Sequence, residues 1–321
     1  MATSSVSKPV QQNQPRVLSY WSDLAIQVWN HRLLYLMFLL PFAFFFVFRF
    51  YPMLGNVIAF KKYQVGNGIW GSPWIGLGHF KSLFNDQMFM RALWNTVQIA
   101  LWRLLITFPA PILLALFLNE VHHMFYKRFI QTVIYVPYFL SWVIYASILY
   151  IVLSPANGLI NVLLASLGMD KIPFFQKPEY FQPLVILSSV LKETGWAAVI
   201  YLATISGIDP TLYEAAVMDG ANRWKLMWHI TLPGISLTIA TLLILQIGYF
   251  LNVGFEQIFV MQNSIVLSTG DIIETYIYRV GVQRARFDFT TAAGLLNGVV
   301  GLFLVVSADR IAKRMDLPGI F

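Results

Sequence analysis

Six long apolar stretches divide this chain, and they limit its possible folds more than any other feature of the sequence. Each is close to, or longer than, the ~20 apolar residues that a helix needs to cross a bilayer. Charged residues make up only 12% of the chain, roughly half of their share in soluble domains. We therefore predict an all-α integral membrane protein with six transmembrane helices, at residues 33–50, 93–118, 129–153, 182–205, 235–261 and 290–308.

The two ends of the chain differ from this membrane domain, which we place at residues 33–314. Residues 1–16 are polar and predict a disordered tail, and residues 315–321 form a short C-terminal tail. Residues 17–32 carry their apolar side chains on one helical face, which predicts an amphipathic helix lying in the membrane interface. An extension of the first span explains that pattern equally well, so both interpretations stay open.

The polar segment 207–234 lies between the fourth and fifth spans and is too long to be a simple connector. Asp209 is a good helix N-cap and Pro210 suits the first helical position, so a helix is expected to run to about Met218. Gly220 can adopt backbone angles that other residues resist, which predicts a turn at that position.

A second short helix is predicted after this turn. Asn222 is expected to cap it, and the helix is expected to end near His229, with Pro233 stopping it before the next span. The result is a helix–turn–helix whose mixed surface suits docking onto a soluble partner. The side chains expected on that surface are Leu212, Tyr213, Met218, Arg223, Trp224, Lys225 and His229.

Seven residues of this segment follow the spacing E-A-A-x3-G-x9-I-x-L-P. This pattern resembles the EAA signature of permease subunits of binding-protein-dependent ABC importers. The resemblance implies a type I importer fold in which the EAA segment forms cytoplasmic coupling helices that dock on the ATPase subunit. The alternative is an interfacial hairpin that merely links two spans. The residues that carry the signature are Glu214, Ala215, Ala216, Gly220, Ile230, Leu232 and Pro233.

The same resemblance implies the location and partners of the chain. Lys and Arg are divided almost evenly between the two sets of loops, so charge alone leaves the orientation undecided. An EAA loop that meets an ATPase places both termini in the cytoplasm, in a bacterial inner membrane. The implied partners are a second homologous permease subunit, a dimer of ATPase subunits that bind ATP and Mg, and an extracytoplasmic solute-binding protein.

The chain is not expected to be an enzyme or to bind a cofactor itself. It lacks the phosphate-binding loop of ATPases, so ATP hydrolysis is assigned to a separate subunit. It has no cysteine, and the pair His122 and His123 has no third ligand nearby, so no metal site is predicted. The net charge of +7 is dispersed, which favours lipid-flanking cations over a nucleic-acid surface.

Polar residues in the fifth span suggest where a substrate crosses. They are spaced three, three and four apart, which places them on one face of a continuous helix. Amide and aromatic side chains of this kind bind sugars, and the runs 248–259 and 271–281 resemble permeases for oligosaccharides. We expect this stripe to form a wall of the pathway, consisting of Gln246, Tyr249, Asn252 and Glu256.

Two cations also lie within predicted spans, Arg103 in the second and Lys192 in the fourth. If they face the pathway, they favour an acidic oligosaccharide, such as an alginate or other uronate oligomer. The alternative is that they join helices through hydrogen bonds or an ion pair with Glu256. A different class of protein, an ion-coupled secondary sugar transporter, would use Glu193 or Glu256 as its proton site.

Overall fold

The computed structural model describes residues 27–314, and this part of the chain is helical with no β-strand. One isolated antiparallel bridge joins Lys61 to Trp74. The prediction of an all-α protein is confirmed for these residues. The tails at 1–16 and 315–321, and most of the predicted interfacial helix at 17–32, lie outside the described residues.

The chain divides between Val57 and Ile58 into two compact units. The described part of the first unit is one apolar helical run, in which α2 (Arg32–Phe45), a π-helical turn η1 (Phe46–Phe50) and α3 (Tyr51–Met53) follow without a break. The run continues to Phe60, so the helix is longer than the first span predicted at residues 33–50. Pro41 lies inside α2 without ending it.

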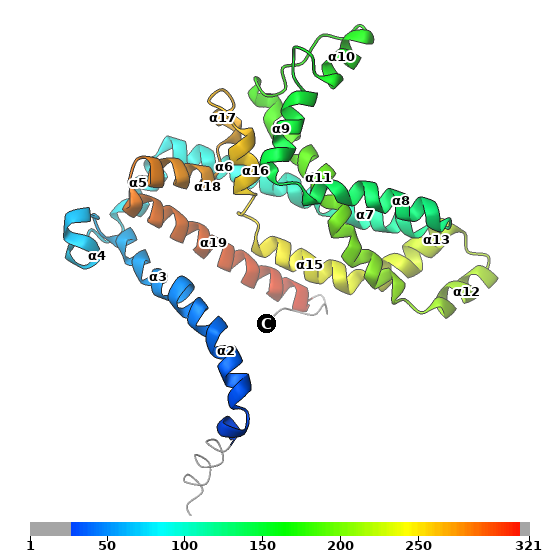
Figure 1. Ribbon diagram of the computed structural model, residues 1–321, viewed down its shortest axis with the longest axis horizontal. Helices are drawn as coiled ribbons and strands as arrows, with labels where there is room; N and C mark the ends of the chain where they lie inside the picture. The colour runs from blue at the N-terminus through cyan, green and yellow to red at the C-terminus, as the bar shows by residue number, and fades with distance from the viewer. Residues whose placement is uncertain (1–26, 315–321) are drawn as a thin grey trace, which may run out of the picture. The chain divides into compact units, whose positions relative to one another are not determined.

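The second unit begins with short helices and then alternates long and broken ones (Figure 1). Its elements in chain order are α4 (Gly68–Gly71), α5 (Gly78–Asn85), α6 (Gln87–Trp102), η4 (Arg103–Thr107), α7 (Pro109–Asn119), α8 (Met124–Tyr135), η5 (Val136–Phe139), α9 (Trp142–Val152), α10 (Leu159–Ser166), α11 (Pro178–Ser206), α12 (Pro210–Met218), α13 (Arg223–Leu226), η6 (Met227–Thr231), α14 (Leu232–Gly234), α15 (Ser236–Gly248), α16 (Phe255–Met261), α17 (Leu267–Gly270), α18 (Ile273–Ile277), η7 (Tyr278–Gln283) and α19 (Phe287–Arg314).

Four helical runs are long and apolar enough to cross a membrane, and two bent pairs could raise that number to six. The four runs are Arg32–Phe60, Gln87–Asn119, Pro178–Ser206 and Phe287–Arg314. The bent pairs are Met124–Phe139 with Trp142–Val152, at 106°, and Arg223–Gly234 with Ser236–Gly248, at 58°. The predicted third span is therefore not one straight helix.

The predicted fifth span, at residues 235–261, is also wrong in its continuity. Helix α15 ends at Gly248, and the next helix, α16, begins only at Phe255. Gly254 precedes α16 with φ of +91°, in the left-handed region that favours glycine. The two halves have different neighbours, since α15 packs against α19 whereas α16 packs against α9 and α18.

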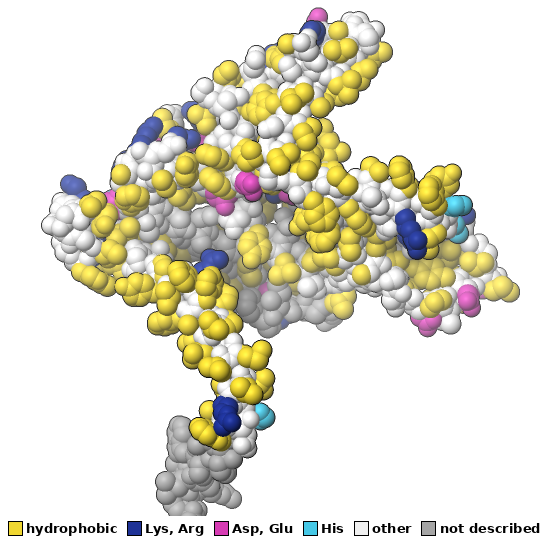
Figure 2. Space-filling view, viewed as in Figure 1, with side chains coloured by type: hydrophobic (Ala, Val, Ile, Leu, Met, Phe, Trp, Pro, Cys, Tyr) yellow, Lys and Arg dark blue, Asp and Glu magenta, His cyan; other side chains and the backbone are white. Residues whose placement is uncertain are grey.

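The core of the second unit is built around α11. This helix packs against α7 and α8, and small residues such as Ala115 and Ala198 let the α7–α11 pair approach closely. On the face seen in Figure 2, hydrophobic side chains cover most of the length of the helices. Charged side chains are visible at the end that carries α12 and α13, with histidines beside them, and also at the opposite end near α4 and α5, which is the pattern expected where helices leave a bilayer.

Candidate functional site

The segment 207–234 forms the helix–turn–helix that its sequence predicts. Asp209 caps α12, because its Oδ1 accepts a hydrogen bond from the backbone N–H of Thr211 at 2.9 Å. The same hydrogen bond holds the pKa of Asp209 below its ordinary value. Helix α12 runs from Pro210 to Met218, as predicted, and none of its residues is buried.

The turn after α12 explains the spacing between the alanines and the glycine of the signature. Gly220 has φ of +77°, and its N–H donates to the carbonyl oxygen of Val217 at 3.0 Å. The N–H of Ala221 donates to the carbonyl oxygen of Ala216 at 2.9 Å. These two hydrogen bonds form the Schellman motif. In this motif the residue four positions after the first capped carbonyl has left-handed backbone angles. Ala216 and Gly220 occupy those two positions.

The second helix begins as predicted but ends later. Asn222 caps α13, with its Oδ1 accepting from the N–H of Lys225 at 3.0 Å. The predicted end near His229 is wrong, because the helical run continues through the π-helical turn η6 to Gly234. The run ends at Gly234, the residue after Pro233, where it bends by 58° into α15, so the predicted stop near Pro233 agrees with the structure.

Side chains on this segment divide into a buried side and an exposed side. The Tyr213 hydroxyl lies 3.0 Å from the Thr231 Oγ1 and joins the two helices; Tyr213 is half-buried rather than exposed. The predicted exposure of the other apolar residues is confirmed, with Met218 87% exposed. The large apolar side chains left exposed here are Leu212, Val217, Met218, Trp224 and Trp228.

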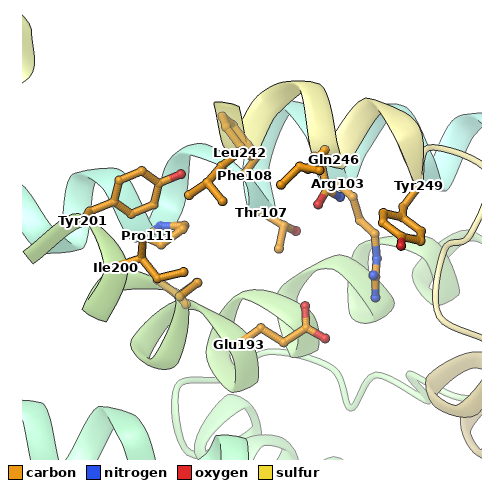
Figure 3. A pocket seen from close by; sticks show the side chains of 13 residues that line it. Arg103, Thr107, Phe108, Pro111, Glu193, Ile200, Tyr201, Leu242, Gln246 and Tyr249 are labelled. Atoms are coloured by element: carbon orange, nitrogen blue, oxygen red, sulfur yellow. The ribbon is translucent and has the colours of Figure 1, made fainter. Parts of the chain in front are cut away.

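A second feature is a pocket of about 300 Å³ between η4–α7, α11 and α15 (Figure 3). Arg103 and Glu193 lie on different helices and both extend into this space, with Gln246 and Tyr249 on the α15 side. Arg103 begins a π-helical turn, a distortion that is frequent at functional sites. The residues that line the pocket are Arg103, Thr107, Phe108, Pro111, Glu193, Thr194, Ala197, Ile200, Tyr201, Leu242, Leu245, Gln246 and Tyr249.

Three buried polar atoms of these lining residues have no hydrogen-bond partner in the described chain. They are Arg103 Nε, Thr107 Oγ1 and Thr194 Oγ1. Buried polar groups in proteins are nearly always paired, with protein, water or a ligand. These three atoms are themselves buried, so they are polar groups left unsatisfied in the wall of the pocket.

Arg103 is positioned by a buried hydrogen-bond network on the side away from these free atoms. Its Nη2 donates to Ser189 Oγ at 2.9 Å and also to Gln257 Oε1. Gln257 is fully buried, and its Nε2 donates to the carbonyl oxygen of Val185 at 2.8 Å and to Ser188 Oγ at 2.9 Å. The network joins the second span, α11 and α16, the second half of the broken fifth span.

Gly254 is required by this arrangement for two reasons. Its φ of +91° disfavours any residue with a side chain, and a Cβ at this position would lie 3.2 Å from Arg103 Nη2. The guanidinium thus packs directly on the backbone that precedes α16.

The comparisons with known proteins decide the family. The family model described as "Binding-protein-dependent transport system inner membrane component" matches residues 107–317, about two thirds of the chain. The chain belongs to this family. The permease is a membrane component rather than the ATPase of an ABC importer, as the sequence predicts.

Curated relatives and solved structures agree with that family. The permease is 46% identical to protein LplB of Bacillus subtilis (strain 168) over 288 residues, which cover 90% of this chain and 91% of LplB. It is also 46% identical over 298 residues to the polygalacturonan/rhamnogalacturonan transport system permease protein YteP of the same organism, covering 93% of each. These identities extend the match over nearly the whole chain.

Two solved structures share the fold. One belongs to a bacterial ABC transporter involved in the import of the acidic polysaccharide alginate, with a TM-score of 0.86, 42% identity and coverage of 91% of this chain and 99% of that chain. The other is a bacterial alginate ABC transporter in complex with an alginate pentasaccharide-bound periplasmic protein, with a TM-score of 0.86, 41% identity and coverage of 92% and 98%. The type I importer fold and the resemblance to oligosaccharide permeases are confirmed.

The structure separates the residues of the predicted stripe. Gln246 and Tyr249 line the pocket, whereas Asn252 lies in the break between the helices and Glu256 is on α16. The prediction of one continuous helical face is wrong because the helix that would align these four residues ends at Gly248. Both Asn252 and Glu256 are exposed, and Glu256 forms no ion pair within residues 27–314. Glu256 thus makes no direct ion pair with Arg103 or Lys192 here, although its charge interacts with that of Lys192.

Lys192 is on α11, and its side chain reaches the bend of the third span rather than the pocket. Its Nζ donates to the carbonyl oxygens of Tyr138 at 2.9 Å and Pro137 at 3.3 Å, at the end of η5. The ammonium also lies 5.1 Å from the centre of the Trp142 ring. A cation suits this position because the last carbonyls of a helix carry partial negative charge and lack partners within the helix.

The sequence alone does not assign Thr107, Thr194, Gln257 or Gly254 to the site, and it indicates Glu193 only as a proton site. The roles of Gln257 and Gly254 depend on Arg103, which is more than 150 residues away in the chain. A glycine inside an apolar stretch was the one hint of a broken helix.

Proposed function

We propose that this permease moves an acidic oligosaccharide across the bacterial inner membrane, driven by ATPase subunits that bind its segment 207–234. The observation that carries the proposal is the exposed helix–turn–helix built on the EAA spacing. It presents apolar side chains that no described residue covers, and it continues directly through α14 into α15. A movement of the docked segment would therefore pull on a helix that lines the pocket.

The signature residues divide into two roles in this proposal. Ala216 and Gly220 shape the turn, Glu214 and Ala215 lie on the exposed length of α12, and the Ile230–Pro233 end connects the segment to α15. Docking on the ATPase then depends on the shape of the turn as much as on the exposed side chains.

The pocket supports the assignment of the substrate. Arg103, Gln246 and Tyr249 form a wall that offers a cation, an amide and an aromatic ring, the groups that a sugar carboxylate, hydroxyls and ring face require. The related alginate transporter imports an acidic polysaccharide by its description. We assign Lys192 to support of the third-span bend, and Glu256 and Asn252 to the exposed outer half of the fifth span.

The proposed assembly follows from the same family. Six spans with both termini in the cytoplasm place segment 207–234 beside the ATPase. A second homologous permease subunit completes a heterodimer, two ATPase subunits bind ATP and Mg, and an extracytoplasmic solute-binding protein delivers the sugar. The complex of the related transporter with a sugar-bound periplasmic protein supports this last partner.

The test is ATP-driven uptake by the whole complex in proteoliposomes, with binding protein loaded with either an acidic or a neutral oligosaccharide. We expect ATP hydrolysis and uptake to be stimulated by the acidic sugar more than by the neutral one. Equal stimulation by both would reject the acidic substrate. Uptake driven by a proton gradient without ATP would reject the importer and favour the ion-coupled transporter, with Glu193 at its centre.

A further inference from the structure

Glu193 is a carboxylate in the middle of a membrane-spanning helix. It lies on α11 (Pro178–Ser206) and is half-buried. Its charge interacts with those of Arg103 and Lys192, but no described side chain hydrogen-bonds to it or forms an ion pair with it at contact distance. Its neighbour Lys192 is committed to the third-span bend. Ionisable groups within membrane-spanning helices are energetically expensive, so a carboxylate that faces a pocket indicates a function.

The surroundings of Glu193 indicate what it meets. The pocket that it enters is also lined by Arg103 and Thr107 from the second span and by Gln246 from α15 (Figure 3). Polar side chains from different helices thus line the same small space. An apolar occupant would take the Glu193 carboxylate out of water without replacing its hydrogen bonds, so the chemistry favours an occupant that carries hydroxyl groups.

The size of the pocket limits the occupant further. A volume of about 300 Å³ is at the lower end of the range for small-molecule sites, and it suits one sugar ring rather than a longer segment of a chain. Tyr249 lies at this pocket with its side chain 65% exposed, where its ring can lie against the face of a sugar.

We propose that Glu193 is a specificity-determining residue that accepts hydrogen bonds from the hydroxyls of one sugar unit in transit. This inference rests on the proposed function. An ionised carboxylate has two oxygens and can accept from two hydroxyls at once. It also repels the carboxylate of an acidic sugar and so directs that group toward Arg103, which fixes the orientation of the ring in the pocket.

The experiment measures ATP-dependent uptake of a uronate oligomer by the reconstituted complex. Glu193→Gln keeps the shape and one acceptor oxygen but loses the charge, and we expect its KM for uptake to rise about ten-fold, equivalent to ~1.4 kcal/mol. Glu193→Ala is expected to raise it further. Glu179→Gln is the matched control, because Glu179 lies on the same helix but lines a separate pocket, and its KM should not change.

Three results would overturn the inference. An unchanged KM in Glu193→Ala would show that the sugar does not meet this carboxylate. Loss of the second permease subunit on purification of Glu193→Ala would show that Glu193 pairs with that subunit. A fall in kcat alone, with KM unchanged, would assign Glu193 to a conformational step. Failure of wild-type uptake would instead reject the proposed function, so the two failures are distinguishable.

Discussion

Replacing Gly220 by alanine tests whether the shape of the coupling turn matters for transport. No heavy atom lies within 4 Å of a Cβ at this position, so the change creates no clash. The cost is conformational alone, because φ of +77° is unfavourable by roughly 1–2 kcal/mol for a residue with a Cβ. A cost of about 1 kcal/mol lowers the population of the formed turn relative to its frayed states about five-fold.

The assay is the concentration of ATPase subunit needed for half-maximal ATP hydrolysis by the reconstituted complex. If the ATPase binds only the formed turn, we expect this concentration to rise by up to about five-fold in Gly220→Ala. Gly220→Asn should behave more like wild type, since asparagine tolerates left-handed angles.

Gly207→Ala is the matched control for the same segment. Gly207 has φ of −90°, which any residue adopts, and a Cβ there would lie 3.4 Å from the Thr204 carbonyl oxygen. We expect this variant to resemble wild type. If Gly220→Ala also resembled wild type, or if Gly220→Asn were as impaired as Gly220→Ala, the argument from the Schellman turn would be refuted.

Two further predictions concern the packing around the pocket and the outer end of the second span. Gln257→Leu removes one of the two acceptors of the buried Arg103 guanidinium, leaving Ser189 Oγ, and is expected to destabilise the complex by about 1–3 kcal/mol, measured as a lower Tm; Gln257→Glu, which keeps an acceptor, should lose less. Burial raises the pKa of Asp86, but hydrogen bonds from the Tyr276 hydroxyl at 2.8 Å and from backbone N–H groups outweigh it and hold the pKa below its ordinary 3.8. The stabilisation by ionised Asp86 is thus fully present above pH ~3.8 and is lost as the pH falls through the lower folded pKa. In Asp86→Asn, Tm should fall less steeply than in the wild type as the pH is lowered below ~3.8. An unchanged dependence of Tm on pH would contradict the stabilising role of ionised Asp86.

The coupling segment was largely predictable because its determinants are local. Asp209 and Asn222 cap helices through backbone groups two or three residues away, and Gly220 ends α12 through bonds within the same turn. Such signals are complete in a short window of sequence. The end of the second helix was missed because a π-helical turn depends on packing as well as on composition.

The candidate pathway was harder to predict. The predicted stripe in the fifth span requires a continuous helix. The helix is broken between Gly248 and Phe255, so the four residues do not share one face. Arg103 was correctly singled out as a polar group in a span, but its partners Ser189 and Gln257 are brought to it only by the folded bundle.

The sequence by itself determined the membrane class, the helical fold, the coupling turn and the family, because hydrophobic length, capping and motif spacing are properties of neighbouring residues. Only the tertiary structure decided which ionisable groups share a pocket. Lys192 and Glu193 are adjacent in the chain, yet one stabilises a bend and the other enters the pocket, since successive residues of a helix point in different directions. Which direction meets a neighbouring helix, and which meets open space, depends on how the whole bundle packs.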